Sequence, residues 1–112
     1  MYSKDLIKGT LQPIIIQLLH EKERMYGYEI TREVKQRTAG KLEITEGALY
    51  PALHKLEADG ILKTEKELHG NRIRKYYSFT SSGEKQGQTL LIEFRDFLDS
   101  MRLILNSKSN LV

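Results

Sequence analysis

Hydrophobic residues recur every three or four positions in four segments of the chain, and two shorter segments alternate like strands. The first periodic segment covers residues 10–20. We expect a helix there that buries one face, with Thr10 as its N-cap and Pro13 in the first turn, where its missing N–H costs nothing. Residues 3–9 add a short leading turn, and residues 21–24 form a polar connector. The inward stripe of this helix comprises Leu11, Ile14, Ile15, Leu18 and Leu19.

A second helix is predicted to begin at Gly27, which is an acceptable N-cap. Ile30 and Val34 share one face of this helix, as core residues do. Two tyrosines, Tyr26 and Tyr28, flank the glycine. We interpret them as packing at the helix entry, because paired aromatics around a cap usually pack; direct contact with a ligand is the alternative.

The third helix begins at Thr45, a good N-cap residue. Leu49, Leu53 and Leu56 follow at the spacing i, i+4, i+7 and must point inward. Pro51 conflicts with a helix, because inside a helix it removes a hydrogen bond and crowds a preceding carbonyl. Either the helix starts near the proline after a separate turn, or it bends there. We expect a continuous helix with a bend, because the leucine stripe keeps its phase across the proline.

Gly60 ends the third helix, and two strand-like segments follow it at residues 61–68 and 73–79. The residues between them, His69-Gly70-Asn71-Arg72, supply the turn chemistry of a hairpin. The alternation is imperfect, since Lys75 falls on the apolar face of the second strand. Either a bulge or a hairpin end that projects beyond the core explains this.

The last helix is predicted to start at residues 81–84, whose Ser-Ser-Gly-Glu sequence fits the S-x-x-E capping box. Residues 82–106 would make a rod of roughly 37 Å, which is longer than the rest of the domain can cover. Residues 107–112 are predicted to be a flexible tail. The apolar stripe of this helix comprises Leu90, Leu91, Phe94, Phe97, Leu98, Met101, Ile104 and Leu105.

Composition excludes several classes of protein. The chain has 112 residues, of which 39% are hydrophobic and 29% charged, as in a single globular domain. It has no Cys and its three His lie far apart, so we expect no disulfide, no metal and no cofactor. Its aliphatic runs are far shorter than the ~20 residues that span a membrane, and no secretion signal is evident. We therefore expect a cytoplasmic protein without a membrane partner. No Ser/His/acid set or phosphate-binding glycine loop indicates an enzyme.

The net charge is +3, and basic residues gather in the hairpin at residues 63–75. Three short helices before a basic two-stranded hairpin predict a winged helix-turn-helix, a mainly α (α+β) fold in residues 1–80. Its third helix, residues 45–59, would enter the major groove of DNA. Geometry must then direct Glu57 and Asp59 away from the DNA. The residues expected to contact DNA are Thr45, Tyr50, His54, Lys55, Asn71, Arg72, Arg74 and Lys75.

Several of these residues also have a purely structural interpretation. The alternative for Tyr50 is a half-buried aromatic that closes the core, and the alternative for His54 is a solvated side chain. The basic hairpin has an ordinary charged surface as its alternative. Arg72, Arg74 and Lys75 crowd beside the glycine turn, however, and this favours contact with phosphates.

The last helix, residues 81–106, is either an intrachain core helix or the seam between two copies of the chain. Its length relative to the small body favours the seam, so we expect a homodimer held by the eight stripe residues named above. A two-fold dimer places two recognition helices on one face of a duplex, about 34 Å apart. Such a dimer requires a pseudo-palindromic operator.

These segments resemble the PadR family of bacterial transcriptional regulators, and the Gly-x-Leu-Tyr-Pro motif of the third helix is the specific part. The single trailing helix is similar to that of the shorter members. The resemblance implies a winged-helix dimer, usually a repressor, that leaves its operator when an effector is sensed. It also implies that Pro51 lies within the recognition helix. The matching segments are residues 26–30, 46–57, 60–62, 74–80 and 83.

Some short members of that family bind flat hydrophobic drugs in a pore at the dimer interface, beside a Trp of the last helix. This chain has no Trp. We expect Phe94, Phe97 and Met101 to form a packed dimer core rather than to line a pore. The sequence thus predicts a homodimeric DNA-binding repressor, and the resemblance implies a small-molecule effector whose identity the sequence does not give. The alternative is a winged-helix module that binds another protein through its last helix.

Overall fold

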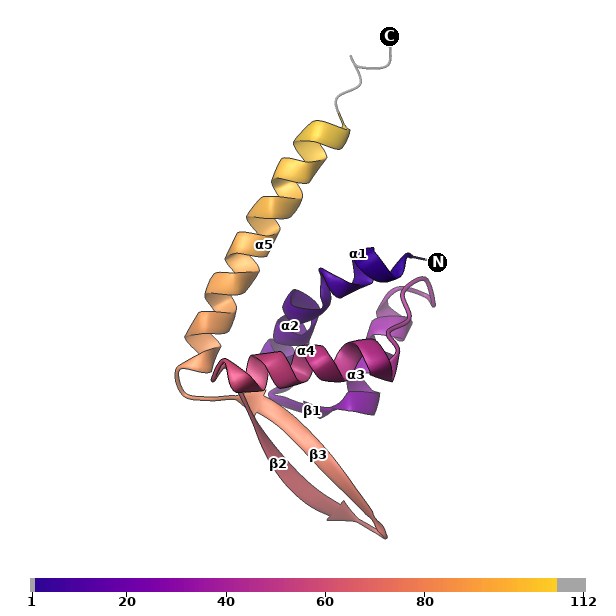
Figure 1. Cartoon of the computed structure of the whole chain (residues 1–112), viewed down its shortest axis with the longest axis vertical. Coiled ribbons are helices and arrows are strands. Elements are labelled where there is room, and N and C mark those ends of the chain that lie inside the picture. Colours follow the sequence, from indigo (N-terminus) through magenta and orange to yellow (C-terminus); the bar gives the residue numbers. More distant parts are fainter. Residues whose placement is uncertain (1, 107–112) are drawn as a thin grey trace.

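The computed structural model describes residues 2–106 of the chain. Within that range the chain forms five helices and one three-stranded antiparallel sheet (Figure 1). Three helices followed by a hairpin make the predicted winged helix-turn-helix. The predicted flexible tail, residues 107–112, lies outside the described residues. In chain order the elements are α1 (Lys4–Lys8), α2 (Leu11–Lys22), β1 (Arg24–Tyr26), α3 (Gly27–Arg37), α4 (Glu46–Ala58), β2 (Leu62–His69), β3 (Arg72–Phe79) and α5 (Gly83–Leu105).

The core lies between α2, α3 and α4, and it is built from the periodic aliphatic residues. Ile15 and Leu53 are both fully buried. The stripe of α2 differs from the prediction at one position, because Ile14 is half-buried whereas Ile16 is buried. Helix α5 packs against α2 on that side, where a Cβ added to Gly87 would lie 3.1 Å from the Ile16 side chain. Helix α2 is therefore covered from two sides.

Helix α4 follows the predicted pattern. The Thr45 hydroxyl accepts a hydrogen bond from the Ala48 N–H at 3.2 Å and so caps the helix. The leucines of the inward stripe, Leu49, Leu53 and Leu56, are fully buried. The helix continues through Pro51, which is exposed. The chain leaves α4 through Gly60, whose φ of +76° favours glycine. The prediction of a continuous helix across the proline is confirmed.

The sheet has a third strand that the sequence pattern did not reveal. Strand β1 pairs with β3 through contacts such as Met25 opposite Tyr77, which gives the order β1-β3-β2. The prediction of a polar connector at residues 21–24 was wrong, because α2 continues into this segment and β1 begins at its end. Three residues are too few for an alternating pattern to be recognised. The predicted two-stranded hairpin is the protruding part of this larger sheet.

Strands β2 and β3 pair continuously along the whole length of β2, and this continuous register excludes a bulge. The outer half of the hairpin instead projects beyond the helices (Figure 1). Leu68 and Ile73, which face each other near its tip, are 73% and 67% exposed. A projecting hairpin end therefore explains the imperfect alternation around Lys75.

The N-cap of α3 differs from the prediction, whereas Thr10 is the N-cap of α2 as predicted but does not cap it through its side chain. The N-cap of α3 is Tyr26 rather than Gly27, and its N–H donates to the Glu29 carboxylate at 3.1 Å. The Thr10 hydroxyl donates to the carbonyl of Ile7 at 3.0 Å, at the end of α1, and among the described residues it accepts no hydrogen bond from α2. The cap of α3 is thus completed by a residue of its own first turn, whereas the Thr10 hydroxyl bonds to α1.

The predicted capping box at residues 81–84 is also wrong. Thr80 takes its place, because its hydroxyl accepts from the Gly83 N–H at 2.9 Å and donates to the Gly60 carbonyl at 2.6 Å. The backbone at Gly83 lies so close to Ile61 that an added Cβ would overlap the Ile61 carbonyl oxygen. One hydroxyl thus joins the end of α4 to the start of α5.

Helix α5 is buried against the body only in its first half. Its buried residues are Gly83, Gly87 and Leu91, and its second half extends away from the helices (Figure 1). Leu91 was expected in the seam between two copies, but it is 4% exposed and packs in the chain's own core. Leu90, also expected in the seam, is half-buried and packs against the same core, and the other stripe residues lie farther along the helix.

Candidate nucleic-acid interface

The side of α4 that faces away from the core carries small or flat side chains. Because Leu49, Leu53 and Leu56 point inward, helical geometry turns four residues outward, and all four are exposed. A helix with so little side-chain bulk allows its backbone to come close to another surface. The outward residues, which we call the α4 ridge, are Gly47, Pro51, His54 and Ala58.

Tyr50 lies beside the α4 ridge rather than on it. It is half-buried against the core, and its hydroxyl lies 2.5 Å from the position that a Cβ on Gly27 would occupy. Its ring centroid is 6.4 Å from that of His54. Tyr50 therefore sits at the joint between α3 and α4, as in the structural interpretation of this residue. Only glycine at position 27 leaves room for it.

We expect Gly27→Ala to push the Tyr50 ring outward and to lower the stability of the domain by about 1–3 kcal/mol, the usual cost of overpacking. Chemical denaturation followed by circular dichroism measures the change. Tyr50→Ala leaves space for the new methyl group, so the double variant should lose less stability than the two single variants combined. Strict additivity would show that the two positions do not compete for space.

The C-terminal end of α4 holds charged groups that are already paired. Lys55 donates to the Asp59 carboxylate at 3.1 Å, four residues along the helix. Glu57 accepts from the Thr64 hydroxyl at 3.3 Å and lies half-buried between α4 and β2. The carboxylates of Glu57 and Asp59 are thus held by neighbours, and the Lys55 side chain remains exposed.

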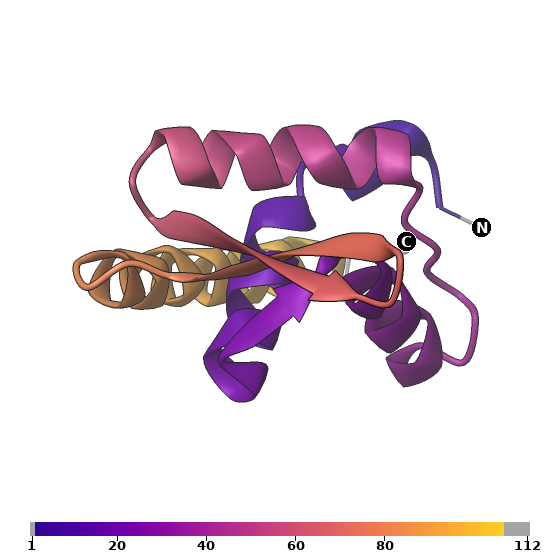
Figure 2. The ribbon, with the colours of Figure 1, turned by 90° about the horizontal axis from the view of Figure 1, so that it is seen from below.

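The hairpin has two faces with different chemistry. Thr64 and Tyr77, which are opposite each other in the register, point toward α4 and the core, and this side is the inner face. Figure 2 shows α4 lying along one side of the hairpin. Lys66 and Lys75 form the next register pair on the same face, where two like charges directly opposite each other destabilise a sheet. An anion beside them would remove that cost.

Tyr77 anchors the inner face in the core. Its side chain is fully buried, and its hydroxyl has no hydrogen-bond partner among the described residues. Burial raises the pKa of Tyr77 above its ordinary value. The Lys75 ammonium group lies 5.5 Å from the centre of the Tyr77 ring, which holds the lysine stem close to the body.

The outer face carries both signs of charge. The Arg74 guanidinium group lies over the Tyr26 ring, 4.5 Å from its centre, and Arg24 is paired with Glu65 at 3.2 Å and with Glu67. The hydrogen bond from Arg24 holds the pKa of Glu67 below its ordinary value. This face is a network of internal pairs and is not simply basic.

The structure therefore divides the basic residues that the sequence grouped together. Arg72 and Arg74 lie on the outer face, whereas Lys75 lies on the inner face with Lys66. Asn71 and Arg72 are exposed at the tip, next to Gly70, whose φ is +61°. Strand alternation alone separates neighbours in this way.

Three lysines beside the candidate interface, Lys66, Lys4 and Lys8, were missed by sequence reasoning. Lys66 is placed beside Lys75 by the register of the hairpin, which the sequence alone does not give. Lys4 and Lys8 of α1 line a groove against α4, on whose other wall lie Lys55 and Pro51. The sequence signal for Lys4 and Lys8 was weak, because a five-residue helix shows no periodicity that would place it beside α4.

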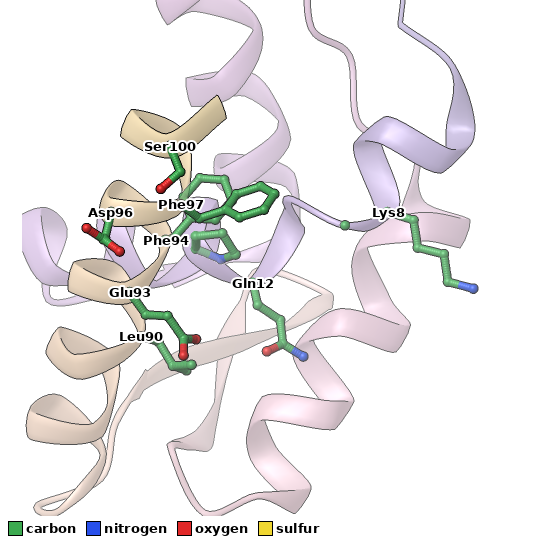
Figure 3. A pocket seen from close by; sticks show the side chains of 10 residues that line it. Lys8, Gln12, Leu90, Glu93, Phe94, Asp96, Phe97 and Ser100 are labelled. Carbon is green, nitrogen blue, oxygen red and sulfur yellow. The ribbon is translucent and has the colours of Figure 1, made fainter. Parts of the chain in front are cut away.

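A second surface runs along α5. Phe97, Ile104 and Leu105 of the stripe are 52%, 63% and 75% exposed, and the Phe94 and Phe97 rings stack with centroids 6.3 Å apart. These rings line a groove that the start of α2 closes on the other side, with Pro13 and Gln12 among its residues. Figure 3 shows the phenylalanines extending from α5 toward α2, and Lys8 pointing away.

Two features are absent from residues 2–106. No helix there is both long and apolar enough to cross a membrane. No group of three or more potential metal ligands occurs in the same range.

The chain matches the model of a known protein family. The family is described as the transcriptional regulator PadR-like family, and the match covers residues 15–89, from α2 into α5. The matched range contains α3, α4 and the whole hairpin, which are the elements of the candidate interface.

Individual proteins agree with this match. The chain is 31% identical over 98 residues to the transcriptional regulator Rv3488 of Mycobacterium tuberculosis, with 85% of each chain covered. A transcriptional regulator from Clostridium thermocellum superposes with a TM-score of 0.76 at 30% identity, covering 91% of this chain and 96% of that one. A PadR family transcriptional regulator from Eggerthella lenta gives a TM-score of 0.75 at 26% identity, covering 92% and 88%.

Proposed function

The chain belongs to the transcriptional regulator PadR-like family, and on that premise we propose that it is a cytoplasmic repressor that binds operator DNA as a homodimer. The observation that carries the proposal is the α4 ridge next to the Lys66–Lys75 pair. A helix with a compact outer side can enter the major groove, and a basic hairpin beside it can hold the phosphate backbone. We assign DNA binding to residues 1–80 and dimerisation to residues 81–106.

In this proposal the α4 ridge lies in the major groove. Gly47, Pro51 and Ala58 let the helix approach the bases closely, and apolar groups of this size suit the methyl group of thymine. His54, in the middle of the ridge, contacts a base edge. Tyr50 holds α4 against α3 and acts as a positioning residue, because its hydroxyl points toward Gly27.

Phosphate contacts flank the ridge on both sides. Lys4, Lys8 and Lys55 provide ammonium groups beside α1, and the Thr45 hydroxyl lies at the positive end of the α4 dipole. Across the ridge, the inner face of the hairpin provides two more ammonium groups. The tip residues Asn71 and Arg72, with Arg74 and Lys75 behind them, complete the proposed set of DNA contacts.

Lys66→Ala combined with Lys75→Ala should reduce the salt dependence of operator binding, because fewer counterions are released. Each lost phosphate contact lowers the slope of log K against log salt by about 0.9, so the double variant should lose about 1.8 for each half-site and about 3.6 for the dimer. Fluorescence anisotropy at several salt concentrations measures the slope. Arg102→Ala, at the far end of α5, is the control that removes one basic group and should leave the slope unchanged. An unchanged slope in the lysine variant would show that the inner face of the hairpin does not contact DNA phosphates.

Footprinting on the DNA upstream of the chain's own gene tests the function as a whole. We expect two protected half-sites, about one helical turn apart, as the two-fold dimer requires. Weak binding that salt abolishes and that has no sequence preference would instead favour a module for binding another protein. A small molecule that releases the operator would identify the effector in the same assay.

A further inference from the structure

A groove lies between the short helix α1 and helix α4, and we call it the α1–α4 groove. Its volume of about 680 Å³ falls within the ~300–1,000 Å³ that small-molecule sites commonly have. Lys8 and Gln12 border both this groove and the one along α5, and in Figure 3 the Lys8 side chain points away from the phenylalanines of α5. Within the described part of the chain, no residue of α5 lines the α1–α4 groove. It is therefore separate from the proposed dimer seam.

The floor of the α1–α4 groove is aliphatic. Leu11 is buried there, and three smaller or partly covered side chains, Ile7, Ala48 and Ala52, pack against the core and leave their other side open to the groove. Among the described residues that line the groove, none is aromatic. A flat ring would have no aromatic face to stack on. An aliphatic floor of this kind suits a flexible hydrocarbon chain.

The rim of the α1–α4 groove is basic. Lys4 and Lys8 lie one turn apart on α1, and Lys55 borders the groove on α4. Within residues 2–106, Lys4 and Lys8 form no ion pair, whereas the acid that borders the groove, Glu43, is already paired with Lys35 at 3.0 Å. An aliphatic floor below ammonium groups matches a hydrocarbon chain that ends in an anion.

We propose that the α1–α4 groove binds a free fatty acid and that this binding releases the operator. The acyl chain lies along the aliphatic floor, and the lysines of the rim hold the carboxylate. The release of the operator rests on the proposed function, to which the inference adds the chemical class of an effector and its site. Binding of the fatty acid to the chain does not depend on DNA and is measured without it.

The α1–α4 groove and the α4 ridge share two residues, which makes the fatty acid a competitor of DNA. Gly47 and Pro51 belong to the ridge and also line the groove. An acyl chain in the groove adds bulk beside the side of α4 that is proposed to enter the major groove. Its carboxylate also neutralises ammonium groups that the proposed function assigns to phosphates. Space and charge therefore both oppose simultaneous binding.

Calorimetric titration of the full chain with octanoate, decanoate and dodecanoate measures the binding, at concentrations below those at which they form micelles. We expect one molecule per chain. A fully buried methylene contributes about fourfold in affinity, so each lengthening by two carbons should tighten binding by about four- to fifteenfold. Decyltrimethylammonium has the chain length of decanoate and the opposite charge. It should bind at least about tenfold more weakly than decanoate, because the lysines of the rim repel it.

Lys4→Gln combined with Lys8→Gln tests the rim. Both lysines are exposed, so the fold should persist, and the affinity for decanoate should fall about tenfold with the loss of two charge contacts. The matched control is Lys22→Gln with Lys85→Gln, which removes two exposed lysines from α2 and α5. This control has the same change in net charge and should keep the affinity of the wild type.

Fluorescence anisotropy with a labelled operator tests the competition. Dodecanoate at ten times its own dissociation constant should raise the apparent Kd of the wild type for the operator by at least about tenfold, by mass action. Ala52→Leu places a larger side chain in the groove without changing the α4 ridge. This variant should bind the operator as the wild type does, bind dodecanoate at least about tenfold more weakly, and stay on the operator at the same concentration.

Three results with the wild type overturn the inference and leave the proposed function intact. They are no binding of dodecanoate, an affinity that does not rise with chain length, and binding that leaves the operator in place. None of them needs a variant, so misfolding cannot obscure them. An affinity for decanoate that the rim variant retains in full also overturns the inference, since the carboxylate would then lie elsewhere. Absence of operator binding by the wild type without fatty acid contradicts the proposed function itself, and the calorimetric test of the groove still decides the site.

Discussion

Phe97→Asp should convert the proposed homodimer into monomers and lower operator affinity by at least about a hundredfold, because two linked half-sites bind far more tightly than one. Phe97 is 52% exposed in the free chain and stacks on Phe94 beside the groove at the start of α2. A carboxylate there would have to lose its water in an apolar seam. Light scattering after size exclusion measures the mass, and anisotropy measures the affinity.

Ile92→Asp is the control for this prediction. Ile92 is 64% exposed on the same helix, but at 100° per residue it lies far around the helix from the stripe. It introduces the same charge and should leave the mass of the dimer unchanged. A wild-type chain that is a stable monomer would contradict the proposed dimer interface on α5. A dimer that persists in Phe97→Asp would show that the interface does not include Phe97.

Gly83→Ala should be the most destabilising single methyl group that can be added to the chain. The new Cβ would overlap the Ile61 carbonyl oxygen and would also lie 2.6 Å from the Thr80 hydroxyl. Both contacts involve groups that position the start of α5, and the first is with backbone, which cannot rotate away. Overpacking usually costs about 1–3 kcal/mol, and a backbone clash lies at the upper end of this range. The melting temperature should fall by about 5 °C or more.

Gly47→Ala is the matched control, since a Cβ at Gly47 meets nothing closer than the Thr45 hydroxyl oxygen at 4.0 Å. In an exposed helix position alanine is favoured over glycine by up to about 1 kcal/mol, so this variant should be as stable as the wild type or more so. Differential scanning calorimetry compares the two. Equal melting temperatures for Gly83→Ala and the wild type would mean that α5 is not held as closely to Ile61 as the structure describes.

The parts of the fold that the sequence predicted correctly are those marked by a hydrophobic repeat over several turns or by characteristic turn residues. Leu49, Leu53 and Leu56 mark the inward side of α4, and their phase carries across Pro51 because the helix does. The hairpin was also predictable, since Gly70 and Asn71 mark its turn. These features depend on residues close together in the chain, where local geometry decides the outcome.

The parts that were not predicted depend on contacts between distant segments. Strand β1 exists because β3 offers it an edge, and Thr80 caps α5 because Gly60 and Gly83 meet there. A helical wheel places Tyr50 beside His54 on the side away from the core, but in the structure its ring packs into the space beside Gly27. No pattern within a single element contains this information.

The separation of Lys75 from Arg74 illustrates the same limit at the candidate site. The two are neighbours in sequence and lie on opposite faces of β3, so a count of charges cannot assign them to one surface. The register places Lys66 beside Lys75 instead. A charge count therefore identifies the right hairpin but not the face that meets DNA.

The hydroxyl of Thr80 has a mechanical consequence. It ties the end of α4 to the first residue of α5, a helix of 23 residues and therefore about 35 Å long. If this joint is stiff, tilting that arm by about 5° moves its far end by roughly 3 Å, close to the ~3.4 Å between successive base pairs. In a dimer, the angle between the two α5 helices would then set the distance between the two α4 helices. A small change in that angle would alter the half-site spacing to which the dimer can bind.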